Sequence, residues 1–420
     1  MSAVDSPAEI EDQVRSWVDD HWDPDLRLGD WWQLLADSGF AHPMLPENAG
    51  GKGWGQSQAM RVMRALAAAD VVGPPTGLGY MLAAPTIAEH GTDEQIERYI
   101  PNILNGREAW CQLFSEPVAG SDLAGLQSRA IEDGDEWRVT GQKVWTSQGN
   151  IADLGMLVAR TDPDAPKHRG LSYFVLEMDQ DGVDVRPLKE MTGRTFFSEV
   201  FMDDAIVAAD AMIGDRGDGW RVANTTLAVE RASIGAGMAS YAKAQPGSKV
   251  NAFDRRVGDV VERSKRPSSG GHAPNVGMKL FDRYVELGRS LGRLEDPVLR
   301  QELMELYSDL RVNRMNIQRA RQKSQRTGGE PNIAKLIDGE LHRRFRDVSL
   351  RIIQADGMLS GPSSSTDPTI AELVLYAQAP PIYGGTDQIQ RNILGERVLG
   401  LPKEPGFDKN TPFSELPKNV

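Results

Sequence analysis

The side chains that most often carry nucleophilic or metal chemistry are scarce in this sequence. One cysteine, Cys111, is present in 420 residues, which excludes an internal disulfide and a thiolate zinc site. The histidines lack the close spacing on one helix that a zinc hydrolase needs. They are His21, His42, His90, His168, His272 and His342. The sequence therefore predicts no metal centre.

The composition predicts a folded protein of two or three structural units, with 40% hydrophobic and 25% charged residues. The net charge of -13 opposes binding to nucleic acid, although local basic clusters can still meet the phosphates of a small ligand. No apolar run is long enough to span a bilayer, and Asp5, Glu9 and Glu11 stand where a signal peptide would be basic. We expect a cytoplasmic protein that binds neither nucleic acid nor membrane.

Hydrophobic periodicity divides the chain into helices, then strands, then helices. Apolar residues recur at helical spacing up to about residue 104, and again from Trp220 to Gly400. Between them, short segments such as 137–140, 156–159 and 173–176 are rich in β-branched and aromatic residues. This order predicts an α+β protein and argues against an alternating βαβ fold. The predicted units are 1–110, 111–215 and 216–402, with a polar tail at 403–420.

Two segments fit no regular element. Residues 244–276 are rich in Gly, Ser, Pro and basic side chains, and the tail after Leu401 is polar. Because little apolar area offsets the entropy of ordering, we expect both to be mobile. The basic residues Lys243, Lys249, Arg255 and Arg256 form either a solvated face or a contact with ligand phosphates.

Four segments of the chain carry sequence motifs. They read FSEPVAGSD at Phe114–Asp122, GQKVWTSQG at Gly141–Gly149 and IYGGTDQIQR at Ile382–Arg391, after LPENAGG at Leu45–Gly51. These motifs, in this order, resemble those of the acyl-CoA dehydrogenase family over nearly the whole chain. The family has a helical N-terminal domain, a central β domain and a C-terminal helical bundle, and the predicted order of elements agrees with it.

The resemblance implies a flavoprotein oxidoreductase of fatty acid and lipid metabolism, with FAD as cofactor. A base removes the α proton of an acyl-CoA, and the β hydrogen leaves as hydride to flavin N5, giving the 2-enoyl-CoA. By residue type alone, Trp145 is a core aromatic and Ser147 a turn residue. The resemblance instead puts Trp145 against the flavin ring and Ser147 near N5. Phe114 and Ser115 would line the pyrimidine side, Gly120 and Ser121 the flavin pyrophosphate or CoA, and Thr386 and Gln388 a site completed across a dimer interface.

The catalytic base is the place where the sequence departs from many family members. Gly384 occupies the position of their glutamate, but its backbone N–H can still bind the thioester carbonyl. A subgroup that includes the isovaleryl and long-chain enzymes carries its glutamate on another helix, directly before an arginine. Glu230 and Arg231 fit that pattern, with Arg231 orienting Glu230 or the substrate. The alternative is an ordinary surface carboxylate paired with Arg231 or another neighbour.

The second half of the cofactor site is degraded relative to the family. Its arginine motif reduces to Arg289 followed by Ser290, and the loop at 353–357 lacks one glycine. Arg289 is either a phosphate contact or a solvated helix residue. Such a half-site is similar to those of heteromeric bacterial acyl-CoA dehydrogenases. The resemblance thus implies a homo- or hetero-oligomer, dimer or tetramer, with an electron-transferring flavoprotein or similar acceptor. The alternatives are a catalytically silent subunit and a relative with another flavin reaction.

Overall fold

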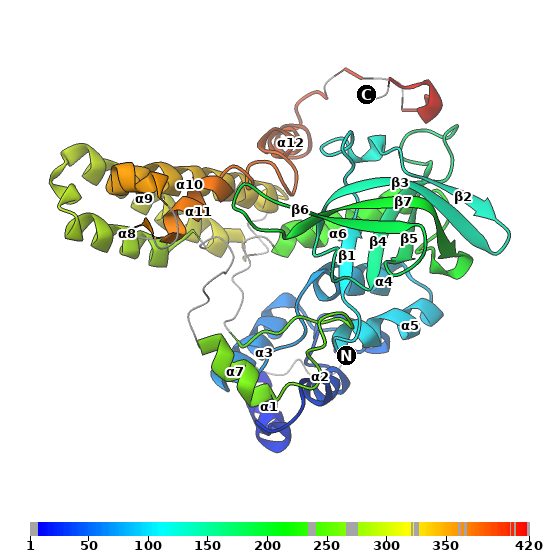
Figure 1. The fold of residues 1–420 in the computed structure, drawn as a ribbon, viewed down its shortest axis with the longest axis horizontal. Coiled ribbons are helices and arrows are strands. Elements are labelled where there is room, and N and C mark those ends of the chain that lie inside the picture. The colour runs from blue at the N-terminus through cyan, green and yellow to red at the C-terminus, as the bar shows by residue number, and fades with distance from the viewer. Residues whose placement is uncertain are drawn as a thin grey trace.

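A computed structural model gives the fold of this chain (Figure 1). It describes residues 7–233, 241–265, 276–320, 322, 327–359, 363–364, 368–403, 405–406 and 409–417. Helices precede and follow a β unit, so the predicted α+β class is confirmed. No helix within these residues is both long and apolar enough to cross a membrane.

The N-terminal unit is a helical layer built around buried tryptophans. Its helices are α1 (Pro7–His21), α2 (Leu28–Asp37), α3 (Gln56–Ala68), α4 (Ala84–His90) and α5 (Asp93–Leu104). Thr92 caps α5, because its side chain accepts from the Gln95 N–H while Gln95 bonds back to the Thr92 N–H. The indoles of Trp31 and Trp32 donate to the carbonyls of Val72 and Gly73 at 2.7 and 3.0 Å. Their polar atoms are therefore satisfied inside the core.

The β unit is a mixed seven-stranded sheet. Its strands are β1 (Trp110–Leu113), β2 (Arg129–Asp133), β3 (Glu136–Ser147), β4 (Leu154–Arg160), β5 (Leu171–Glu177), β6 (Val183–Leu188) and β7 (Phe197–Ala208). The order is β1-β4-β2-β3-β7-β6, and β5 also pairs with β4. Strand β4 is buried along its whole length, which explains its continuous apolar sequence.

The C-terminal unit consists of one helix within the main body and a bundle that projects from it (Figure 1). Helix α6 (Gly219–Ser233) contacts α4, β5 and α10. The bundle has its own hydrophobic core, which includes Tyr284, Leu306 and Phe345. Its helices are α8 (Met278–Ser290), α9 (Pro297–Ala320), α10 (Glu330–Ile353) and α11 (Pro368–Tyr376), followed by α12 (Asp387–Ile393).

The expected mobility of residues 244–276 is wrong for 244–265. This stretch returns to the N-terminal unit and forms α7 (Val257–Lys265), whose Val257, Val260 and Val261 are buried. Those valines recur at helical spacing, a pattern that the polar average of the segment conceals. Lys249 donates to the Ala152 carbonyl at 3.1 Å, so it contacts the protein's own backbone. Residues 266–275 lie outside the described residues.

The polar tail is also not mobile throughout. Phe413 is 6% exposed and packs on the β unit, where its N–H donates to the Ala165 carbonyl at 3.0 Å. One aromatic residue supplies the apolar area that the rest of the tail lacks. The described tail residues 409–417 thus lie against the β unit rather than beside the bundle (Figure 1).

Candidate active site

The first two motifs are joined by a buried ion pair. Lys143 Nζ lies 2.9 Å from Glu116 Oε1, and both side chains are buried. The ammonium group also donates to the carbonyls of Phe114 and Val158 at 3.1 and 2.8 Å. Three acceptors match its three N–H groups, so the pair is ionised and fully satisfied on the lysine side. Sequence reasoning missed this pair, although an acid in one motif and a base in the other were its signal.

Burial and pairing act against each other at these two residues. Burial would raise the pKa of Glu116, but Lys143 and nearby hydrogen bonds outweigh it and hold the pKa below its usual value. The backbone N–H groups of Gln127 and Ser128 donate to this carboxylate at 2.6 and 2.9 Å. Burial lowers the pKa of Lys143, although Glu116 opposes that shift. A buried charge of this kind is tolerated only with its partner in place.

The second motif contains a bulge that turns Trp145 outward. The register between β3 and β7 shifts between Lys143 and Thr146, and Trp145 has a φ of 62°. A left-handed backbone at a tryptophan is strained and is typical of functional positions. The indole is 61% exposed, with one edge-to-face contact to Phe197 at 5.9 Å between ring centroids. This side chain offers a flat apolar face rather than a core contact, and Ser147 follows it, half-buried.

The remaining predicted residues of the first motif divide into buried and open positions. Phe114 is buried against Tyr173, with ring centroids 5.9 Å apart, so a ligand contact at this residue would use its backbone. The Ser115 carbonyl accepts from the Val144 N–H at 2.9 Å, which aligns the two motifs. Gly120 and Ser121 are exposed, and a Cβ added at Gly120 would meet no atom within 4 Å. The loop therefore has room for a ligand.

Glu230 lies in the last turn of α6, where the three units meet. Thr226, one turn earlier on the same face, bonds to Thr86 of α4 at 3.0 Å and to Tyr173 of β5 at 3.3 Å. The Gln112 amide of β1 faces the Glu230 carboxylate and stabilises its charged form. Within the described residues, the amide nitrogen of Gln112 meets no partner at standard hydrogen-bond geometry, so this contact is loose.

The environment of Glu230 differs from that of a solvated surface carboxylate. Burial raises the pKa of Glu230, and Gln112 and Arg231 only partly oppose it. Arg231 is half-buried, and burial lowers its pKa, with Arg397 adding to the shift. Gln112 stands two residues before Phe114, so the structure brings Glu230 to the first motif.

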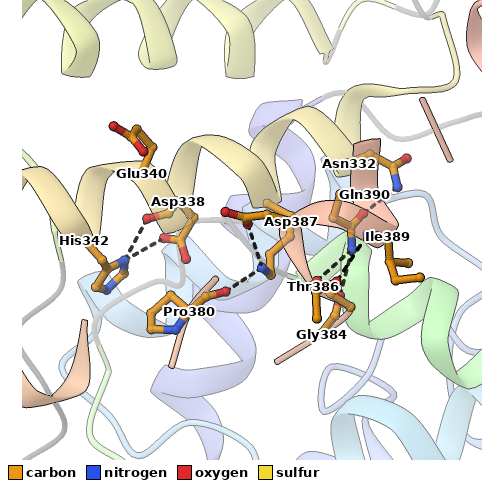
Figure 2. Close-up of polar contacts among 12 residues, drawn as sticks. Asn332, Asp338, Glu340, His342, Pro380, Gly384, Thr386, Asp387, Ile389 and Gln390 are labelled. Atoms are coloured by element: carbon orange, nitrogen blue, oxygen red, sulfur yellow. Dashed lines mark hydrogen bonds and ion pairs between the residues drawn. The ribbon is translucent and has the colours of Figure 1, made fainter. Parts of the chain in front are cut away.

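The third motif forms the turn before α12 (Figure 2). Thr386 caps this helix, since its hydroxyl accepts from the Ile389 N–H at 3.2 Å. The Gln390 amide donates to the carbonyls of Gly384 and Gly385 at 2.9 and 3.3 Å, and its own carbonyl accepts from Asn332 of α10 at 2.6 Å. Among the described residues, no group accepts from the Gly384 N–H. This donor is therefore available to a ligand.

The degraded half-site is separate from these contacts. Arg289 is exposed near the end of α8, and Gln354 is exposed at the end of α10 with a φ of 51°. Gln388 is exposed on α12, beside the buried Asp387, which Arg343 binds at 2.8 Å. Arg289 and Gln388 are both exposed, so their side chains lie at the surface of the described chain, and none of the contacts above connects them to Glu230.

Comparisons with known proteins agree with this arrangement. Residues 7–107, 111–205 and 268–399 match, in that order, the models of the N-terminal, middle and C-terminal domains of acyl-CoA dehydrogenase. Acyl-CoA dehydrogenase IpdE1 of Mycobacterium tuberculosis is 35% identical over 375 residues, 89% of this chain and 88% of that protein. The chain belongs to the acyl-CoA dehydrogenase family.

Other relatives of this acyl-CoA dehydrogenase agree. Acyl-CoA dehydrogenase FadE34 of M. tuberculosis is 36% identical over 88% of this chain, which spans 46% of that longer protein. The solved "Tcur3481-Tcur3483 steroid ACAD" has a TM-score of 0.69 and 24% identity, over 96% of this chain and all of the other, and confirms the fold. The prediction of an oxidoreductase acting on the CH–CH group of an acyl-CoA is confirmed, and membership implies a flavin cofactor.

Proposed function

We propose that this acyl-CoA dehydrogenase uses Glu230 as the base that removes the α proton of its thioester substrate. The observation that carries the proposal is the position of this carboxylate, half-buried at the junction of α6 with the β unit and facing Gln112. A carboxylate with a raised pKa is a stronger base toward a carbon acid. Gly384, at the position of the catalytic glutamate in many family members, has no side chain that could accept the α proton.

The residues around the substrate divide the reaction between them. Glu230 takes the α proton, and the electrons of that C–H bond form the new double bond while the β hydrogen leaves as hydride. The free Gly384 N–H donates to the thioester oxygen, which stabilises the charge that develops as the proton departs. Arg231 orients Glu230. The product is the 2-enoyl-CoA.

The flavin that fits these residues is FAD, which accepts the hydride when bound. The exposed Trp145 indole offers a face for the isoalloxazine ring, and the Ser147 hydroxyl beside it offers a hydrogen bond near N5. The open backbone at Gly120 and Ser121 has room for a diphosphate. Thr386 and Gln388 would complete the site.

The assembly we propose is an oligomer that passes electrons to an electron-transferring flavoprotein or similar acceptor. Exposed Arg289 and Gln388 support it, because both side chains lie at the surface, where a second chain can meet them. Two solved neighbours, a steroid acyl-CoA dehydrogenase and the ChsE4-ChsE5 complex of M. tuberculosis, have names that pair two proteins. A heteromer is therefore the form to test first.

The direct test is flavin bleaching. The protein is purified alone and with candidate partner subunits, flavin per chain is measured, and straight, branched and sterol side-chain CoA thioesters are added without oxygen. We expect a yellow protein whose absorbance near 450 nm falls with a competent thioester, on the order of seconds or faster. A colourless protein in every combination would exclude the flavin site, and a yellow protein that never bleaches would favour a catalytically silent subunit.

A further inference from the structure

The end of the chain binds beside the open loop of the first motif. We call residues Pro412–Leu416 the C-terminal clamp. Phe413 is buried, and the N–H groups of Phe413 and Ser414 donate to the carbonyls of Ala165 and Pro163 at 3.0 and 2.9 Å. These acceptors belong to the hairpin loop between β4 and β5. The clamp is therefore docked by backbone hydrogen bonds as well as by its aromatic ring.

The Phe413 ring covers a buried arginine. The Arg160 guanidinium lies 3.3 Å from the ring centroid, an intimate cation–π contact. Its N–H groups donate to the carbonyls of Ala124 at 2.7 Å, Lys167 at 3.1 Å and Leu126 at 3.4 Å. Burial lowers the pKa of Arg160 to about 10, so the group stays charged at neutral pH. Arg160 thus connects Phe413 to backbone carbonyls that accept no hydrogen bond within a helix or between strands.

Two of these carbonyls, those of Ala124 and Leu126, belong to the loop that begins at Ser121. Asp122, next along, pairs with Lys167 of the same hairpin loop on which the clamp is docked. Gly120 and Ser121 are exposed, and within the part of the chain described the Ser121 side chain makes no hydrogen bond. Arg160 and Lys167 thus hold the loop from the side of the hairpin, while the Glu116 carboxylate binds the Gln127 N–H at its far end.

We propose that Phe413 is a positioning residue for the Ser121 loop, acting through Arg160, and through that loop for a diphosphate ligand. The ligand half of this inference rests on the proposed function. Diphosphate is the chemistry that FAD and CoA share, and a loop held in advance binds it without an ordering cost. Removing the ring leaves the face of a buried guanidinium uncovered and loosens its hold on Ala124 and Leu126.

The test compares the full-length protein, in its purified assembly, with Phe413→Ala. Hydrogen exchange needs no ligand or turnover, and we expect the amides of residues 121–127 to exchange about 3- to 30-fold faster, as loss of a desolvated cation–π contact predicts. Phe413→Tyr keeps the aromatic ring and should keep the wild-type protection of these amides from exchange. Phe413→Leu keeps only apolar bulk and should lose that protection. The exposed Glu415→Gln in the same clamp is the matched control and should change nothing.

Ligand measurements on the same variants identify the diphosphate. Lower FAD content per chain would assign the loop to the flavin, and a raised KM for the acyl-CoA with kcat per bound flavin unchanged would assign it to CoA. Unchanged exchange in Phe413→Ala overturns the inference, as does faster exchange with both ligand measurements unaltered. If the wild-type protein never bleaches, the proposed function fails, but the exchange result still decides whether the clamp holds the loop.

Discussion

In the β unit, a buried ion pair joins two motifs to each other, whereas the motif of the C-terminal unit is held within its own turn by hydrogen bonds and a helix cap, and by the ion pair of Asp387 with Arg343 of α10. Lys143 and Glu116 satisfy one another in the core, while Gln390 binds the Gly384 carbonyl and Thr386 caps α12. Because Lys143 and Glu116 are buried and paired with each other, neither side chain can bind a group on another subunit. Arg289 and Gln388 are exposed, and among the described residues no hydrogen bond or ion pair holds their side chains.

This difference indicates which part of the site one chain completes unaided. The β half sets Trp145 and the Ser121 loop through contacts within the described chain, and it brings Gln112 to Glu230. The C-terminal half offers polar groups outward, as expected where a cofactor is shared with a second subunit. Substitutions in the β half should thus cost stability or turnover directly, and those in the exposed half should matter only after assembly.

The largest expected effect follows from breaking the buried pair. Lys143→Met leaves the Glu116 carboxylate buried without its partner and should lower the free energy of unfolding by about 3–5 kcal/mol. Urea unfolding followed by tryptophan fluorescence measures it. The matched control is Lys189→Met, at an exposed lysine, which should change the free energy by less than about 0.5 kcal/mol. A loss below ~1 kcal/mol at Lys143 would show that the β half is not organised by this pair.

Next in size is the loss of the base. Glu230→Gln keeps the size of the side chain but cannot accept the α proton, so flavin reduction by substrate should slow by at least ~100-fold. FAD content should not change, and Glu286→Gln, at an exposed helix position, is the control. Stopped-flow absorbance measures the rate. Wild-type bleaching in Glu230→Gln would make Glu230 a structural carboxylate, with the base in another residue or subunit.

A carboxylate restored at the other family position sharpens this result. Gly384→Glu, added to Glu230→Gln, should recover part of the lost rate, because relatives reach the same α carbon from that backbone position. Recovery should be incomplete, since Gly384 has a φ of 62°, where a glutamate costs roughly 1 kcal/mol or more. The single variant Gly384→Glu, still carrying Glu230, controls for damage caused by the new side chain.

The pH dependence of flavin reduction gives a smaller, graded effect. Burial raises the pKa of Glu230 above 4.5, and the base works only when deprotonated. The rate should therefore fall about tenfold per pH unit below the raised pKa and level off above it. The same shift means that the folded state favours the protonated carboxyl, so ionising Glu230 as pH rises costs stability. A rate profile that falls only below pH ~4.5 would contradict a desolvated base.

The smallest effect is expected in the exposed half. Arg289→Ala should change the free energy of unfolding of the chain by less than about 0.5 kcal/mol, because its side chain is solvated. The flavin content per chain should fall in the assembled oligomer, whereas the unassembled chain should show no change. Lys279→Ala, at an exposed position earlier in α8, is the control. Full flavin content in oligomeric Arg289→Ala would leave Arg289 as an ordinary surface residue.

Sequence reasoning succeeded where the signal is local. The strands around Val139 and Val175 follow from short-range composition and periodicity. The pairing of Glu116 with Lys143 spans 27 positions, and nothing in the spacing specifies it. The docking of Phe413 and of α7 was missed because each depends on a few apolar residues within a polar average. The roles of the site residues stay predictions.

Helix α7 also bears on how the protein is made. Val257, Val260 and Val261 belong to the same hydrophobic core as Trp31 and Trp32, and Phe253 packs edge-on against Trp32. During synthesis, residues 7–104 thus lack part of the core that they share with α7. Until residue 265 emerges, the growing chain exposes an apolar surface that invites chaperones or premature association. A fragment that ends near residue 110 should aggregate readily, because it contains α1 to α5 but lacks α7.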